Sequence, residues 1–193
     1  MNEIVDRLRE NKLKAYEADH GLIKEHFGIE EVVLAGGYGY RQVLELVQNG
    51  ADAILEGNEV ETGQSCPARI EVALDGSRLY VANTGAAFSE AGIDAILRSH
   101  SSPKRGNQIG RFGLGFKSLL RLGGKIEITS GPAAFYFDPD RCRQELRQRF
   151  RVTDAPALRL AWPMDDAPAN ALRGRFPWAT TVVCAEIVTE KLI

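Results

Sequence analysis

Apolar residues at spacings of three and four predict helices in the first part of the chain. Between residues 3 and 27, leucines, Ile23 and Phe27 stand among charged residues, and Gly21 is expected to divide this stretch into two helices. A stronger helical pattern runs from about Tyr40 to Leu55. Shorter helices are predicted at 89–99 with Ser89 as N-cap, at 112–122 and at 139–151.

The helix predicted from Tyr40 to Leu55 carries two stripes on different faces. The apolar stripe consists of Leu44, Val47, Ala51 and Leu55. The polar stripe consists of Glu45, Asn49, Asp52 and Glu56. The pattern is therefore that of an amphipathic helix.

Alternation of apolar and polar residues predicts two β-hairpins and later strands. Residues 68–83 form the first hairpin, with Asp75-Gly76 as its turn. The second hairpin pairs 125–130 with 133–138. Later strands are predicted at 157–162 and 180–188, and loops at 34–41, 57–68, 100–108 and 163–177.

Length, composition and charge indicate one ordinary globular domain. The chain has 193 residues, of which 44% are hydrophobic and 26% charged. We therefore expect a single domain over 1–193, with an N-terminal helical segment at 1–35. The net charge of −2 gives no whole-chain attraction to nucleic acid or membrane. No apolar run approaches the roughly 20 residues of a membrane span, and the acidic start is unlike a signal peptide, so a cytoplasmic location is expected.

The cysteines are odd in number and far apart. Cys66, Cys142 and Cys184 include no pair with the spacing of metal ligands. Buried free thiols in a reducing compartment are the expectation.

Glu45 and Asn49 are the first candidates for chemistry. They stand four residues apart on the predicted helix, so both side chains can reach one site. A carboxylate can orient and deprotonate a water, and an amide oxygen is a hard ligand that suits Mg²⁺. Asp52 can position a neighbouring polar group. A solvated polar face is the alternative interpretation of the same pattern.

A glycine-rich run, IGRFGLGFKS at 109–118, is the second candidate. Gly110, Gly113 and Gly115 leave backbone N–H groups open to a ligand, and the start of the predicted helix suits phosphate. From Ala95 to Ile126 there are seven Lys or Arg and no Asp or Glu, which favours a polyanion. The alternative is that these glycines only let elements pack closely.

The stretch VANTGAAFS at 81–89 is the third candidate. Asn83 can both donate and accept hydrogen bonds at a flat ring, and Gly85 would admit that ring close to the backbone. The alternative is a plain Asn-Thr-Gly turn.

Taken in order, ELVQNGADA, VANTGAAF and IGRFGLGFKS resemble the motifs of the GHKL ATPase superfamily. Within this superfamily, the sequences of the motifs are most similar to the sacsin-type and heat-shock-chaperone-like ATP-binding domains. The resemblance covers roughly residues 40–122. It implies an α+β architecture called the Bergerat fold, a two-layer α/β sandwich in which helices cover one face of a mixed, mostly antiparallel sheet.

The resemblance also implies ATP and Mg²⁺ as ligands, with roles for particular residues. Glu45 matches the general base and Asn49 the Mg²⁺ ligand. Residues 99–110 match the segment known as the ATP lid, with Lys104 as a candidate phosphate contact. The remaining nucleotide-binding positions are Asp52, Ala53, Asn83, Gly85, Phe88, Gly110, Phe112, Gly113, Leu114, Gly115, Phe116, Lys117, Ser118, Thr180 and Thr181.

Two departures from the superfamily pattern affect what can be expected. Asn83 stands where an aspartate usually binds the adenine amine, so the choice between adenine and guanine stays open. Ala86-Ala87 stands where many relatives have a second glycine. Many members also need a Lys or Arg from a following domain to contact the γ-phosphate. We therefore expect a part of a longer protein that binds ATP and hydrolyses it slowly by itself.

Several functions fit these expectations. The first is an ATPase that drives conformational change in a chaperone-like, remodelling or defence protein. Its partners would be further domains of the same polypeptide or a second subunit, with an ATP-dependent dimer possible. The alternatives are a nucleotide sensor that does not hydrolyse and a histidine kinase catalytic domain. The arginines at 141–151 allow a nucleic-acid contact, although an ion-paired helix face is the commoner use of that pattern.

Overall fold

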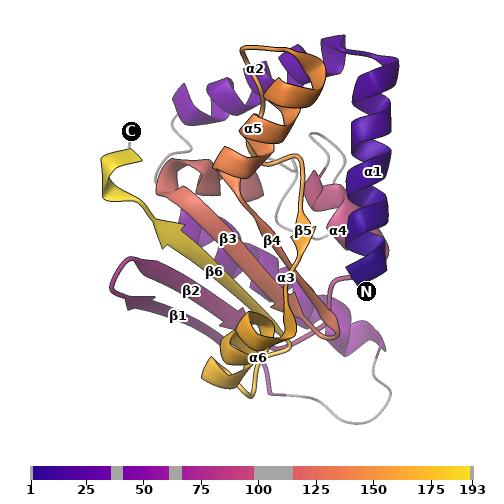
Figure 1. Cartoon of the computed structure of the whole chain (residues 1–193). Coiled ribbons are helices and arrows are strands. Elements are labelled where there is room, and N and C mark those ends of the chain that lie inside the picture. Colours follow the sequence, from indigo (N-terminus) through magenta and orange to yellow (C-terminus); the bar gives the residue numbers. More distant parts are fainter. Residues whose placement is uncertain (1, 36–40, 61–66, 98–114, 192–193) are drawn as a thin grey trace.

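The computed structural model describes the chain except for residues 1, 36–40, 61–66, 98–114 and 192–193 (Figure 1). The helices are α1 Asn2–Ala18, α2 Gly21–Ala35, α3 Gln42–Val60, α4 Glu90–Leu97, α5 Pro139–Phe150 and α6 Asp166–Arg175, with 3₁₀ helices η2 Phe116–Leu122 and η3 Thr189–Lys191. The strands are β1 Ile70–Asp75, β2 Arg78–Asn83, β3 Gly123–Ser130, β4 Ala133–Phe137, β5 Trp162–Pro163 and β6 Thr181–Ile187.

The strands form one open sheet in an α+β fold. Their order is β1-β2-β6-β3-β4-β5, and every pairing among the described strands is antiparallel. The expectation of a mixed sheet was therefore wrong. The last strand, β6, enters between the two hairpins and joins them, which explains why neighbours in the sheet are distant in sequence.

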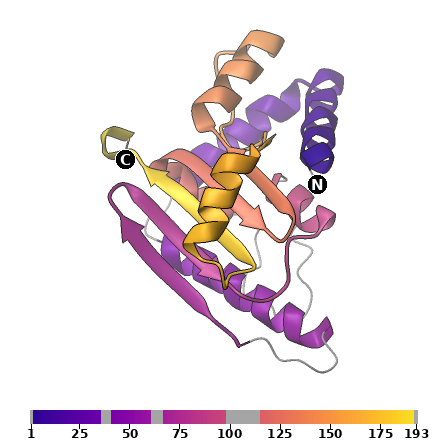
Figure 2. The ribbon, with the colours of Figure 1, turned by 60° about the horizontal axis from the view of Figure 1, so that its bottom comes forward.

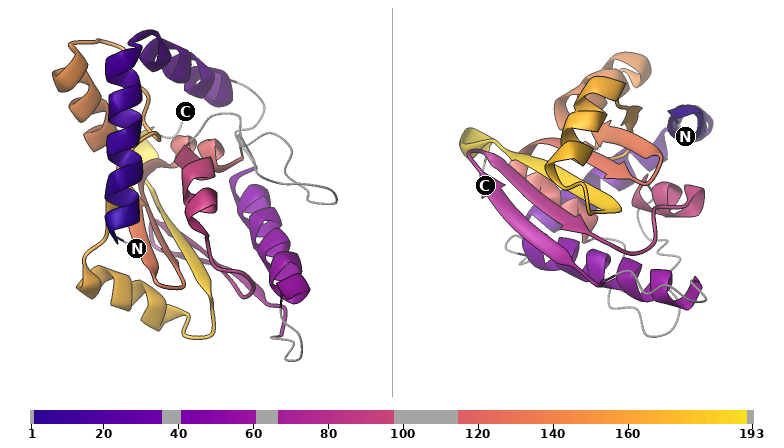
Figure 3. Two further views of the ribbon diagram at one scale, coloured as in Figure 1. Left: turned by 90° about the vertical axis from the view of Figure 1, so that its right-hand side faces the viewer. Right: turned by 90° about the horizontal axis from the view of Figure 1, so that it is seen from below.

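Helices cover both faces of this sheet rather than one (Figures 2 and 3). On the first face, which we call the α3 face, Val81, Ile128 and Val183 pack with residues of α1, α3, α4 and η2. On the opposite face Ala82 and Cys184 pack with Leu172 and Ala169 of α6. Because α6 packs on this opposite face, the expectation that helices cover only one face was wrong. The outer half of α1 packs with α2, α5 and β5 in a separate cluster.

Local sequence signals set several of the element boundaries. The Ser89 hydroxyl accepts a hydrogen bond from Gly92 N at 3.1 Å and so caps α4, as predicted. Asp138 caps α5 by accepting from Arg141 N at 3.0 Å. Gly123 ends η2 in the left-handed conformation, with a φ of 76°. Gly21 begins α2 and separates it from α1, which confirms the predicted division.

Three predicted segments were wrong. Residues 163–177 contain helix α6, and Pro168 lies in its first turn. The N–H groups of a first turn have no acceptor within the helix, so a proline there costs no hydrogen bond. Residues 57–60 continue α3 instead of forming a loop. Of the strand predicted at 157–162, only Trp162 is in a strand. The peptide N–H groups of Ala157 and Leu158 instead bond to the Glu30 carboxylate.

The predicted apolar stripe of α3 is not the face that packs against the sheet. Leu44 and Leu55, the two ends of that stripe, are 50% and 53% exposed. The buried side of α3 includes Leu46 and Gly50. Gly50 lets the helix approach β2 closely, because a Cβ there would lie 3.2 Å from Asn83 Cβ. The buried face of α3 is therefore the one that carries Leu46 and Gly50, not the predicted apolar stripe.

None of the helices in the described residues has the length and apolar character needed to cross a membrane.

Candidate functional site

The end of the glycine-rich run meets the helix that carries Glu45. Gly115 directly precedes η2, and a Cβ at this position would lie 2.8 Å from Glu45 Cδ and nearer still to Oε2. Real Cβ contacts are essentially never closer than 3.0 Å, so only glycine fits without moving the carboxylate. Gly115 has an ordinary φ of −58°, so close approach alone requires a glycine here. Two of the three sequence motifs therefore adjoin in space.

The third motif lies against the same helix. Asn83, at the end of β2, packs on Gly50. Gly85 has a φ of 106°, and a Cβ there would lie 2.5 Å from the Ala53 carbonyl carbon. The next residue, Ala86, donates its N–H to the Ala53 carbonyl at 2.8 Å. Ala53 and Gly85, separate members of the predicted site, are thus in direct backbone contact.

A row of polar side chains crosses the α3 face at the end of the strands. Asn83, Thr181 and Ser130 are cross-strand neighbours on β2, β6 and β3, and all three are buried. The Ser130 and Thr181 hydroxyls are 2.6 Å apart, and Ser130 Oγ accepts the N–H of Phe88 at 2.9 Å. Backbone bonds at Thr180 complete the row, since its N–H donates to the Asn83 carbonyl at 2.9 Å. The row joins Asn83, Phe88, Thr180 and Thr181 of the predicted site.

Ser130 was missed by the sequence analysis. Its role depends on a register between β3 and β6, which a serine at the end of a predicted strand does not reveal.

The amide of Asn83 has a defined orientation. Its Nδ2 donates to the Thr84 carbonyl at 2.7 Å, and a carbonyl can only accept. A reversed amide would place two oxygens against each other at that distance. The Oδ1 atom is therefore the free end of the amide, and no described residue donates a hydrogen bond to it. This end suits a ligand that offers an N–H.

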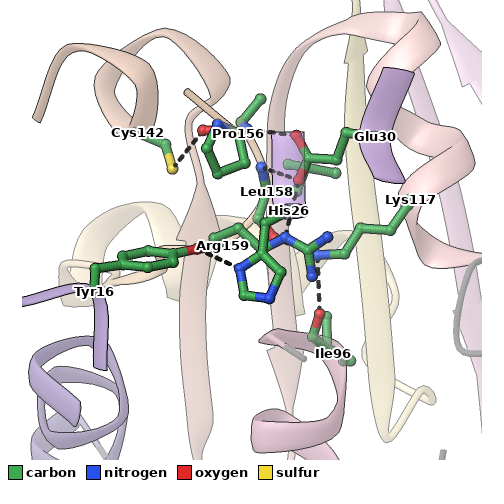
Figure 4. A network of polar contacts seen from close by, with 10 residues as sticks. Tyr16, His26, Glu30, Ile96, Lys117, Cys142, Pro156, Leu158 and Arg159 are labelled. Atoms are coloured by element: carbon green, nitrogen blue, oxygen red, sulfur yellow. Dashed lines mark hydrogen bonds and ion pairs between the residues drawn. The ribbon is translucent and has the colours of Figure 1, made fainter. Parts of the chain in front are cut away.

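Three predicted site residues of η2 direct their side chains into the interior. Phe116 packs on Phe137 with ring centroids 5.1 Å apart. The Ser118 hydroxyl donates to the Gly115 carbonyl at 2.6 Å, and its own N–H donates to the same oxygen at 3.0 Å. Lys117 is fully buried, and its Nζ donates to the carbonyls of Leu158 and Ile96, the latter at 3.1 Å (Figure 4). These side chains hold the turn that presents Gly115.

Lys117 belongs to a buried polar cluster with Glu30 and Arg159 (Figure 4). The Glu30 carboxylate accepts from Ala157 N at 2.5 Å and from Leu158 N at 3.2 Å, and it pairs with Arg159 Nε at 3.2 Å. Burial, and next the positive charge of Arg159, lower the pKa of the Lys117 amine well below its ordinary value. Glu30 and Arg159 were missed, because charged residues in amphipathic patterns usually predict an exposed face.

Some predicted site residues lie outside the described part of the chain. They are Lys104, Gly110, Phe112, Gly113 and Leu114, together with the rest of the predicted lid at 99–110. Asn49 and Asp52 are described. Asn49 is half-buried one turn beyond Glu45, and Asp52 is buried on α3.

A depression of about 400 Å³ lies away from this site, on the opposite face of the sheet. Glu127 and Tyr136 line it together with residues of α1 and the start of α6. Its cations have partners: Arg9 pairs with Asp6 at 2.8 Å, and Arg141 donates to the Tyr136 hydroxyl at 2.5 Å.

Cys142 and Cys184 are buried free thiols, as expected, while Cys66 lies outside the described residues. Burial raises the pKa of the Cys142 thiol to about 12 and that of Cys184 to about 11. Both therefore stay protonated near neutral pH, which makes them poor nucleophiles.

Scanning the chain against models of known protein families gives no match, and a search among curated proteins finds no relative either.

Proposed function

We propose that the chain is an ATP-binding domain that uses Mg²⁺ and hydrolyses the nucleotide slowly. The observation that carries the proposal is the contact between Gly115 and the Glu45 carboxylate. It brings the end of a glycine-rich, basic segment to the carboxylate that is best placed to act on a bound phosphate. The direct contacts of Asn83 and Gly85 with the same helix support a single site built from all three motifs.

We further propose that the fold is of the Bergerat type. The position of α3 across one face of the sheet, and of β6 between the two hairpins, supports this assignment, while the wholly antiparallel pairing of the described strands departs from the mixed sheet of that fold. The additional helix α6 on the opposite face would then be an elaboration of this chain.

The residues of α3 fit the chemistry of hydrolysis. Glu45 would align a water for attack on the γ-phosphorus and take its proton, so that ATP and water give ADP and phosphate. Asn49 supplies a hard amide oxygen one helical turn away, where it would hold Mg²⁺. When bound, the ion would neutralise charge on the phosphate oxygens. The missing side chain at Gly115 leaves room for the Glu45 carboxylate, which so lies directly beside the end of the glycine-rich run.

The proposed output is a conformational change that neighbouring domains of the same polypeptide or a second subunit detect. Binding energy of the nucleotide is the source of such a change, because a ligand shifts an equilibrium only by its preference for one state. A chaperone-like, remodelling or defence protein would each use the domain in this way.

Calorimetry of the wild-type chain with ATP and GTP, with and without Mg²⁺, tests the proposal. We expect ATP to bind at least about tenfold more tightly than GTP, because Asn83 Oδ1 accepts from the adenine amine but faces the oxygen of guanine. Mg²⁺ should strengthen ATP binding. Asn83→Ala should bring the two affinities close together, whereas Asn170→Ala, on the exposed side of α6, should leave the preference unchanged. Failure of ATP to bind in any condition would refute the proposed function.

Gly115→Ala is expected to impair hydrolysis without harming the fold. The new methyl group would displace the Glu45 carboxylate. Because this carboxylate is the end of a flexible side chain, it can move aside while the backbone stays in place. We expect kcat to fall about 10- to 100-fold with a small change in thermal stability, because a misplaced base loses its alignment with the water. Steady-state phosphate release and thermal unfolding measure the two effects.

The matched control for this prediction is Gly174→Ala on α6, where a Cβ would meet nothing within 4 Å. It introduces the same methyl group and should leave kcat unchanged. Equal activity of the Gly115 variant and the control would contradict the assigned position of Glu45.

A further inference from the structure

Lys117 connects three parts of the structure that are distant in sequence. Its Nζ donates to the carbonyl of Ile96 in the last turn of α4 and to the carbonyl of Leu158. Helix C-terminal carbonyls have no partner within their own helix, so the first bond caps α4. Lys117 itself lies on η2, two residues after Gly115.

The Leu158 peptide is held from both sides. Its carbonyl accepts from Lys117, while its N–H donates to Glu30 Oε1 at 3.2 Å. Glu30 belongs to α2, so a continuous chain of hydrogen bonds runs from α2 through Leu158 to η2 and on to α4 (Figure 4). Because three helices and the Leu158 peptide are bound to one another, η2 has little freedom to shift relative to the α3 face.

The same turn fixes Gly115. Both the N–H and the hydroxyl of Ser118 bond to the Gly115 carbonyl, so the position of η2 decides where Gly115 lies. Gly115 in turn lies against the Glu45 carboxylate more closely than any side chain would allow. A shift of η2 would therefore move the surface against which Glu45 is aligned.

We propose that Lys117 is a positioning residue for Glu45 and acts through η2 and Gly115, without contacting phosphate itself. This inference rests on the proposed function. It replaces the expectation, drawn from the glycine-rich motif, that Lys117 contributes directly to nucleotide binding. Complete burial and two backbone partners are what an anchor needs, whereas a phosphate ligand needs an accessible charge.

The test compares Lys117→Met with the wild-type protein in binding and in turnover. Methionine keeps the length of the side chain and removes its donors. We expect kcat to fall about tenfold or more while the Kd for ATP stays within about threefold, because alignment is lost and binding contacts remain. Lys14→Met, an exposed lysine on α1, serves as the control and should change neither quantity.

A second arm needs no turnover: the Gly115 amide resonance should move in Lys117→Met and stay in place in Lys14→Met. If Lys117→Met fails to fold, Lys117→Gln, which keeps one donor group, takes its place.

The outcomes separate this inference from the proposed function. Wild-type hydrolysis that Glu45→Gln abolishes, together with unchanged kcat in the Lys117 variant, would overturn the positioning role alone. An unmoved Gly115 resonance would overturn it as well, whatever the activity. A large loss of ATP affinity would show that Lys117 serves binding, and failure of both variants to fold would show that it serves only the fold.

Discussion

Glu45→Gln is expected to abolish ATP hydrolysis and to leave nucleotide binding nearly intact. Glutamine has the same shape but cannot take the proton of the attacking water, and loss of a general base typically costs about 10²- to 10⁴-fold in rate. Because the wild-type domain is itself expected to be slow, the variant should release no measurable phosphate. The Kd for ATP should change by less than about threefold, since the contacts with the adenine ring and with the phosphates are kept.

Glu56→Gln is the matched control for this change. Glu56 belongs to the same polar stripe of α3 and is exposed near the far end of the helix, so its charge should have no effect on turnover. Unchanged hydrolysis in Glu45→Gln would show that Glu45 is not the general base. Binding of ATP by a wild-type chain with no turnover at all would instead favour the nucleotide sensor, and transfer of phosphate to a protein histidine would favour the kinase.

Glu30→Gln is expected to destabilise the protein by about 3–5 kcal/mol, the cost of breaking a buried ion pair from one side. Glu30 is 3% exposed and Arg159 is fully buried, so water cannot compensate the guanidinium once the carboxylate is lost. Glutamine also places an amide donor among peptide N–H groups that need an acceptor. The free energy of unfolding measured in urea or guanidinium gives the effect.

Glu17→Gln is the control for the buried pair. Glu17 accepts from Arg149 at 2.6 Å, but both side chains are largely exposed, and pairs of this kind contribute at most about 1 kcal/mol. If Glu30→Gln costs no more than Glu17→Gln, the buried cluster does not stabilise the fold, and the anchoring of Lys117 loses its support.

Much of the secondary structure followed from local signals. The division at Gly21, the cap at Ser89 and both hairpins depend on residues close to one another in sequence, and the structure confirms them. Helix α6 was missed because its proline resembled a loop signal, although the first turn of a helix tolerates proline. The strand at 157–162 was wrong because a carboxylate from α2 takes the N–H groups that a neighbouring strand would otherwise use.

The candidate site was only partly accessible to sequence reasoning. The motif residues Glu45, Asn83 and Gly85 could be selected because each motif is local. That Gly85 lies on Ala53, and that Gly115 lies on Glu45, depends on the register of β2 and on how α3 is turned. The free end of the Asn83 amide is decided by one hydrogen bond to Thr84, which no pattern of residue types contains.

The sequence by itself determined most of the helices, both hairpins and the motif residues of the candidate site, because caps, turns and periodicity act over a few residues. Only the tertiary structure decided the antiparallel order of the sheet, the face of α3 that is buried and the position of Lys117. These features depend on hydrogen bonds and close contacts between segments far apart in the chain. A lysine beside a glycine-rich run looks like a phosphate ligand until the fold places Ile96 and Leu158 around its amine.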